Sequence, residues 1–263
     1  MHICNDWYAS GVDIATRIST ARRANGLSAG QLARLAGVST STITRLEAGE
    51  VSPSFDLACT LLEILGQVIE AGPSASVDAI VAARLVLDPV MPVEQGDKVR
   101  EWVGRLGRVA PRRGESPRAA VLRTAALAAR LDKRPGAVDC VPDTPWEVVA
   151  ERLGAAGVEW ALTGSIAANW IVESAGSIWP VFYVADVDAA VAAGRLSRLP
   201  AGVFGPRITL VPFDGVSENG RWEIEPGCWV AATDQVVLDC FAGIGSMPAQ
   251  AEAVLASAEG VTL

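Results

Sequence analysis

The sequence is poor in histidine, and its cysteines lie too far apart to form a recognisable motif. Its 263 residues include one histidine, His2, and five cysteines, none of them in a Cys-x-x-Cys pair. Because histidine is the usual general base near neutral pH, we expect no histidine-dependent catalysis. We likewise expect no disulfide framework, no metal site and no cofactor.

Long hydrophobic runs are also missing. No apolar stretch approaches the roughly 20 residues that cross a bilayer, and residues 1–10 contain no basic stretch followed by an apolar one. We therefore expect a cytoplasmic protein with no secretory signal and no membrane partner. Half of the residues are hydrophobic and 20% are charged, which is enough to build a sizeable core.

Acidic charge is in excess, and it is distributed unevenly along the chain. The formal net charge is -8. Residues 1–66 carry 5 basic and 6 acidic side chains, residues 67–135 carry 12 and 8, and residues 136–263 carry 5 and 16. A chain that is acidic overall binds DNA poorly through bulk charge, but one part of so uneven a chain can still contact it.

Residues 12–66 predict a set of short helices. Ile14, Ile18 and Ala21 recur at helical spacing. Ser28 is followed three residues later by Gln31, which is the pattern of a capping box at the start of a second helix. Further N-cap candidates, Ser39 and Ser54, predict a third and a fourth helix.

Residues 27–49 predict two helices joined by a tight turn. Ala33 is small enough for a crossing helix, and Gly37 suits the turn backbone. Leu32, Val38, Ile43 and Leu46 supply the apolar contacts between the two helices. The second helix then presents an outward polar face, which consists of Thr40, Ser41, Thr42, Thr44 and Arg45.

This segment resembles the phage-repressor (Cro-like, xenobiotic-response-element) helix-turn-helix family over about residues 12–66. The matching stretches are GLS, LARLAGVS, TITRLEAG and PSFDLACTLLEILG. The resemblance implies a five-helix lambda-repressor-like domain with its second motif helix in the major groove. It makes the following residues candidates for DNA contact: Ser28, Gln31, Ser39, Thr40, Ser41, Thr42, Thr44 and Arg45.

Within that set, the resemblance implies different roles. Thr44 and Arg45 would contact bases, since arginine binds guanine O6 and N7 bidentately. Ser28 and Gln31 would lie where free backbone N–H groups meet a phosphate. Arg22 and Glu47 match an internal salt bridge of the family.

The partner that the resemblance implies is double-stranded operator DNA, bound by a homodimer on paired half-sites. An alternative stays open, because residues 1–66 are nearly neutral. In that alternative the helices form a protein-binding module rather than a DNA-binding one.

Residues 73–136 predict a helical connector between two domains, residues 1–72 and 137–263. Its candidate helices are Val77–Leu87, Val93–Leu106 and Ser116–Leu131. The basic side chains of residues 98–134 permit two interpretations, a solvated helical face or a contact with DNA beside the operator.

Residues 137–263 mix strand-like and helical patterns, which predicts a small α+β domain. Expected strands are Val158–Leu162, Trp179–Ala185, Ile208–Phe213 and a weaker one at Trp229–Ala232. A Gly-Ser turn followed by Asp186 and Asp188 permits a nucleotidyltransferase with a magnesium-binding pair. Asp186 and Asp188 also follow directly after a strand, where Asp186 suits the N-cap of the next helix and Asp188 suits a negative charge in its first turn.

The same region resembles the C-terminal domain of abortive-infection type IV antitoxins, over about residues 144–258. The matching residues are Leu162-Thr163-Gly164, Ala167-Ala168, Tyr183-Val184, and Asp234 with Asp239. This resemblance implies a degenerate nucleotidyltransferase fold without its active site, and a cognate toxin as partner. Together the two resemblances predict a DNA-binding transcriptional repressor or an autoregulating antitoxin, and no enzyme.

Overall fold

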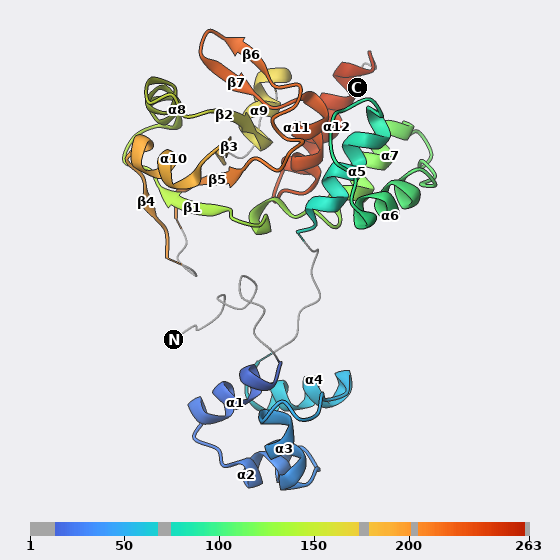
Figure 1. Ribbon diagram of the computed structural model, residues 1–263, viewed down its shortest axis with the longest axis vertical. Coiled ribbons are helices and arrows are strands. Elements are labelled where there is room, and N and C mark those ends of the chain that lie inside the picture. Colours follow the sequence, from blue (N-terminus) through green and yellow to red (C-terminus); the bar gives the residue numbers. More distant parts are fainter. Residues whose placement is uncertain (1–13, 68–74, 174–178, 201–204, 261–263) are drawn as a thin grey trace. The chain divides into compact units, whose positions relative to one another are not determined.

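The structure, a computed structural model, describes residues 14–67, 75–173, 179–200 and 205–260. The chain divides into two compact units, Met1–Gly72 and Pro73–Leu263 (Figure 1). Each unit has its own hydrophobic core.

Unit 1 is helical. In its described residues it contains α1 (Ile14–Ala24), α2 (Ala29–Leu35), α3 (Thr40–Glu47) and α4 (Phe55–Ile64). Of the five helices that the family resemblance implies, these four lie within residues 14–67. The side chains of Ser28, Ser39 and Ser54 each accept a hydrogen bond from the backbone N–H three residues later, so α2, α3 and α4 are all capped by serine.

The core of unit 1 holds α2 and α3 in a fixed relation. Its fully buried residues, from all four helices, are Ile18, Leu32, Ile43, Leu46, Leu61 and Leu62. Gly37 stands in the turn between α2 and α3 with φ +68°. Only glycine adopts this conformation at little cost, so Gly37 allows the tight turn that the sequence predicts.

Unit 2 contains a seven-stranded mixed sheet. Its strands are β1 (Val138–Val141), β2 (Trp160–Thr163), β3 (Val181–Val184), β4 (Ser197–Arg198), β5 (Ile208–Pro212), β6 (Trp222–Glu225) and β7 (Cys228–Val230). Their order is β4-β1-β5-β3-β2-β7-β6. The β3–β5 and β2–β7 pairs are parallel and the other pairs are antiparallel.

Helices cover both faces of this sheet. Trp160 and Phe182 lie on one face, where Trp146 of α8 (Trp146–Ala155) contacts Phe182 with ring centroids 6.5 Å apart. The helix α10 (Val187–Gly194) packs on α8 (Figure 1). Tyr183 faces the other side, where α9 (Gly164–Ile171), α11 (Thr233–Phe241) and α12 (Met247–Ala258) pack together.

The helices of residues 73–136 belong to this unit and do not form the separate connector that the sequence predicts. They are α5 (Val77–Leu87), α6 (Asp97–Leu106) and α7 (Pro117–Ala126), followed by a short 3₁₀ helix at Leu131–Lys133. Both α5 and α7 pack on α11, and all residues from Ala79 to Leu85 are buried. A helix that is buried along most of its length needs neighbours on all sides, and the one buried cation of α5, Arg84, donates to Gln235 of α11 at 3.3 Å.

Several predicted bounds are corrected in the same region. The helix expected at Val93–Leu106 begins at Asp97, and the one expected at Ser116–Leu131 ends at Ala126. The strands β1, β4 and β6 are present although the sequence patterns do not predict them. Among the described helices, none combines the length and apolar character needed to cross a membrane.

Candidate nucleic-acid interface

The helix α3 separates cleanly into a buried face and an exposed face. Ile43 and Leu46 are fully buried in the core of unit 1. The remaining side chains of its first turns are exposed, apart from the half-buried Thr42; they are Thr40, Ser41, Thr44 and Arg45. The exposed face therefore carries hydroxyl groups and one cation and no apolar side chain.

Hydrogen bonds fix the first turn of this exposed face. Ser39 Oγ accepts from the backbone N–H of Thr42 at 3.1 Å and lies 2.8 Å from the hydroxyls of both Ser41 and Thr42. Thr44 Oγ1 donates to the Thr40 carbonyl at 3.0 Å. Because that proton is already used, Thr44 offers a partner an acceptor oxygen and a methyl group, which suits contact with a thymine methyl.

Arg45 is the cation of this face. Its Nε donates to Glu50 Oε2 at 3.3 Å, and the two side chains are 59% and 60% exposed. Within the described residues, no hydrogen bond engages its two terminal nitrogens. An ion pair this exposed contributes about 0–1 kcal/mol, so exchanging Glu50 for a base edge costs little.

At the start of α2, Ser28 and Gln31 form the reciprocal capping box that their spacing predicts. The Gln31 N–H donates to Ser28 Oγ at 3.1 Å, and the Ser28 N–H donates to Gln31 Oε1 at 2.7 Å. Both side chains are exposed. The Gln31 amide nitrogen stays available as a donor to a phosphate, whereas Ser28 contributes mainly by fixing the helix end.

Arg22 and Glu47 join the N-terminal helix to the end of α3. Arg22 Nε and Nη2 donate to the two carboxylate oxygens of Glu47 at 2.6 and 2.7 Å, and Nη1 donates to the Leu27 carbonyl at 2.7 Å. Both side chains are 13% exposed. The hydrogen bond with Glu47 raises the pKa of Arg22 despite burial. This bidentate pair places Arg22 inside unit 1, away from the exposed face of α3.

One exposed cation of α2 is absent from the set of candidates predicted from the sequence. Arg34, on α2, is exposed, and no ion pair in the described part of the chain holds it. Its signal in the sequence is a charged residue at an outward helical position beside the inward Leu32 and Ala33. The candidate interface of unit 1 thus comprises Gln31 and the exposed face of α3, and Arg34 is a further exposed cation on α2.

Unit 2 contains a different polar cluster, which is fully buried. Asp239 on α11 accepts hydrogen bonds from Thr163 Oγ1 at 2.6 Å and Tyr183 OH at 3.0 Å through one oxygen. Its other oxygen accepts from Arg134 Nη2 at 2.7 Å and Gln235 Nε2 at 3.1 Å. Three of these residues, Thr163, Tyr183 and Asp239, are residues that carry the antitoxin resemblance.

The charges in this cluster are balanced within the protein. Burial raises the pKa of Asp239, opposed by the guanidinium of Arg134 and the Thr163 hydroxyl. Burial also raises the pKa of Tyr183 well above its ordinary value, so the phenol keeps the proton that it donates. The cluster consequently joins α11, the sheet and the segment before β1 without presenting a reactive group to solvent.

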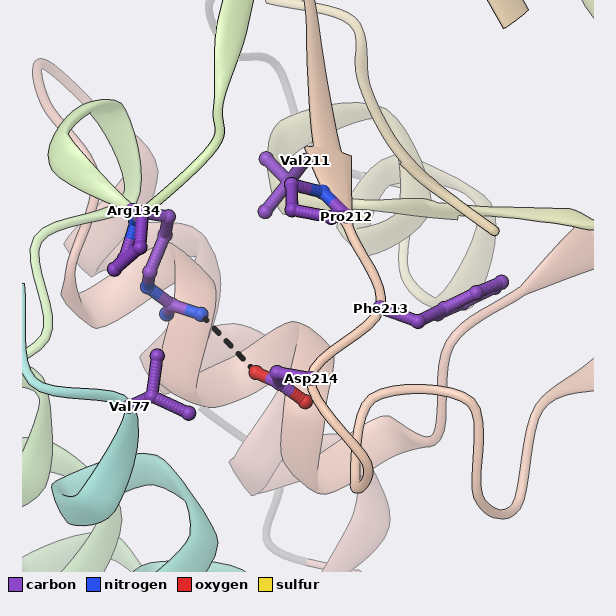
Figure 2. Close-up of a pocket in the computed structure, with 7 residues that line it drawn as sticks. Val77, Arg134, Val211, Pro212, Phe213 and Asp214 are labelled. Atoms are coloured by element: carbon purple, nitrogen blue, oxygen red, sulfur yellow. Dashed lines mark ion pairs between the residues drawn. The ribbon is translucent and has the colours of Figure 1, made fainter. Parts of the chain in front are cut away.

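A cavity of about 230 Å³ borders the cluster (Figure 2). Figure 2 shows Arg134 and Asp214 pointing toward one another across it, with 3.9 Å between Arg134 Nη1 and Asp214 Oδ2. Its other walls are apolar, formed by Val77, Pro135, Val211, Pro212 and Phe213.

The two carboxylates considered for magnesium have partners within the chain. Asp186 Oδ1 accepts from the Ala189 N–H at 3.0 Å and caps α10. Asp188 pairs with Arg198, and both side chains are exposed. In the described residues no group of three or more His, Cys, Asp or Glu side chains could hold a metal ion.

Comparison with known proteins identifies one region of the chain. Residues 13–70 match the family model of a helix-turn-helix domain. No curated protein and no solved structure matches the chain. The match agrees with the helix-turn-helix assignment of unit 1 and with DNA as its partner, and it ends before unit 2 begins.

Proposed function

We propose that this protein is a sequence-specific DNA-binding transcriptional repressor that inserts α3 into the major groove. The exposed face of α3 carries the proposal, because it offers hydroxyls, a methyl group and an arginine whose terminal nitrogens are unbonded in the described structure. The family match over residues 13–70 supports the same assignment. Since DNA is its partner, we propose that it acts in the cytoplasm.

The proposed repressor acts as a homodimer. One copy of α3 presents only Thr44 and Arg45 as strong base-contacting side chains, which cover too few base pairs for a unique operator. A dimer places two copies of α3 on half-sites about 34 Å apart. The number of contacted base pairs then doubles, which is enough to specify a two-fold symmetric operator.

We further propose that unit 2 acts by binding a partner and not by catalysis. Its residues 136–263 carry 5 basic and 16 acidic side chains, which favours a basic protein as partner. Three residues that carry the antitoxin resemblance meet in one buried cluster, which supports an autoregulating antitoxin that also neutralises a cognate toxin.

The alternative, nucleotidyl transfer by unit 2, makes a separate prediction. It requires Asp186 and Asp188 to hold magnesium, although the first caps α10 and the second pairs with Arg198. Magnesium-dependent labelling from nucleoside triphosphates that disappears in Asp188→Asn would support the alternative; no labelling agrees with a binding role.

Selection of bound duplexes from a random pool tests the principal proposal. The full chain should enrich a two-fold symmetric sequence with two half-sites one helical turn apart. Enrichment without a shared sequence would contradict specific recognition, and a single unpaired half-site would contradict the dimer.

A further inference from the structure

The six cations of residues 98–113 form a surface of their own on unit 2. They are Lys98, Arg100, Arg105, Arg108, Arg112 and Arg113, and all are exposed. We call them the α6 basic surface. Residues 97–113 contain only two carboxylates, Asp97 and Glu101, so this surface has an excess of positive charge within an acidic chain.

The way α6 packs fixes the direction of these side chains. Val99 and Leu106 are buried and Trp102 and Val103 are half-buried, so one side of α6 faces the core of unit 2. Lys98, Arg100 and Arg105 lie outside this side and are exposed, with Lys98 and Arg105 on one flank of the helix and Arg100 on the other. Between Lys98 and Arg105 the helix rises about 10 Å, a length over which a duplex presents several phosphates, since it carries one charge per about 1.7 Å.

Most of these cations are not neutralised by the protein itself. Arg100 pairs with Asp97 and Arg105 pairs with Glu101, at exposed positions on α6. In the described parts of the chain, no carboxylate forms an ion pair with Lys98, Arg108, Arg112 or Arg113.

Other basic residues in the neighbouring sequence behave differently. Arg118 is held by Asp234, Arg123 by Glu115, and Arg134 by the buried Asp239. The structure therefore assigns internal roles to the basic residues of α7 and the following segment. It leaves the unpaired positive charge on α6 and the loop after it.

Unit 1 has few cations left for the phosphate backbone. Arg22 is held inside by Glu47, and Arg45 faces the base-contacting side of α3. Among the described residues this leaves Arg23 and Arg34 as exposed arginines without an ion pair.

We propose that the α6 basic surface binds the phosphate backbone of duplex DNA and supplies sequence-independent affinity to the protein. The inference rests on the proposed DNA-binding function, but it concerns a different surface and a different kind of contact. Phosphate contacts carry no base information. Loss of this surface therefore weakens binding to all duplexes and leaves the preference for one sequence unchanged.

The test compares two double variants of the full chain that make the same change in net charge. One is Arg112→Gln with Arg113→Gln. The control is Arg195→Asn with Arg198→Gln, at two exposed positions more than 80 residues after the α6 basic surface in the sequence. Asparagine replaces Arg195 because this residue has a left-handed backbone conformation, with φ 56°, which asparagine tolerates. Binding to a random-sequence duplex is measured as a function of salt concentration.

Two lost phosphate contacts reduce the slope of log affinity against log salt by about 1.8. Between 50 and 200 mM salt, wild type should therefore lose about tenfold more affinity than the Arg112/Arg113 variant, and the control should follow wild type. Equal slopes in both double variants, or no binding of wild type to the duplex, would overturn the proposal.

The outcome is separable from that of the proposed function. A lower slope in the Arg112/Arg113 variant, with no operator preference in any protein, supports the α6 surface and contradicts specific recognition by α3. An operator preference together with equal slopes supports specific recognition by α3 and contradicts the α6 basic surface.

Discussion

The buried ion pair between Arg134 and Asp239 makes a sharp prediction about the stability of unit 2. The two side chains are 2% and 0% exposed. In Asp239→Asn the charge that balances Arg134 disappears while the side chain keeps its shape. Removal of one partner of a buried pair costs about 3–5 kcal/mol, because the buried guanidinium then keeps only the more distant carboxylate of Asp214, 3.9 Å away. Both oxygens of Asp239 accept hydrogen bonds. In asparagine an NH₂ group replaces one of these oxygens, and this group cannot accept the hydrogen bond that the oxygen accepted.

A second aspartate on α11 provides the matched control. Asp234 pairs with Arg118 at 2.6 Å, but these side chains are 22% and 33% exposed. Solvent compensates most of what Asp234→Asn removes, so we expect a loss of about 1 kcal/mol or less. Both variants change the same residue type on the same helix, and they differ in burial.

Urea unfolding followed by tryptophan fluorescence measures this difference. Seven of the eight tryptophans lie in residues 73–263, and the eighth is Trp7, so the signal reports mainly on unit 2. Asp239→Asn should unfold with a free energy about 3 kcal/mol lower than Asp234→Asn. Two variants that unfold within about 1 kcal/mol of each other would refute the reasoning from burial.

Three further predictions concern single contacts. Glu47→Gln should lower the free energy of unfolding of unit 1 by about 1.5–3 kcal/mol, since it removes a charged bidentate pair; Glu50→Gln should change it by less than about 0.5 kcal/mol, and far-ultraviolet circular dichroism during urea unfolding compares the two. Burial raises the pKa of Glu115, but hydrogen bonds from the Arg112 backbone N–H and from Arg123 outweigh burial and lower this pKa below its ordinary 4.5. Its contribution is therefore complete above pH 4.5 and lost as the pH falls through the folded pKa, so wild type should lose more stability than Glu115→Gln on acidification. Gly164→Ala should destabilise unit 2 by at least about 1 kcal/mol in thermal unfolding, because φ is +65° and the new Cβ would lie 3.0 Å from Met247 Cε; wild-type stability in this variant would contradict the strain.

The helices of unit 1 are predictable from the sequence because their signals are local. Serines at 28, 39 and 54 cap helices through bonds to residues three positions away, and Gly37 meets a backbone requirement of its own turn. The exposed face of α3 follows from the burial of Ile43 and Leu46 at helical spacing. Each of these features depends on residues fewer than ten positions apart, so it can be predicted from periodicity and capping patterns in the sequence.

The parts that the sequence does not predict depend on distant contacts. The hydrogen bond between Arg134 and Asp239 joins residues 105 positions apart, and that between Arg84 and Gln235 joins residues 151 apart. No local pattern distinguishes Arg134 from the exposed Arg112. The membership of α5 in the sheet domain likewise depends on α11, although its mostly apolar sequence is consistent with burial on all sides.

In the proposed function Thr44 and Arg45 select the operator, and one measurement tests this selection most directly. It compares the ratio of affinities for the selected operator and a random duplex in wild type, in Thr44→Ala/Arg45→Ala, and in a control, Thr60→Ala/Arg23→Ala. Thr60 on α4 makes the same kind of bond to a carbonyl four residues earlier as Thr44 does, and Arg23 is an exposed arginine outside α3.

Each base contact is worth about 1–3 kcal/mol. The α3 variant should therefore lose at least about 30-fold of the preference, and the control should keep it. An unchanged preference in the α3 variant, or an equal loss in the control, would contradict the account.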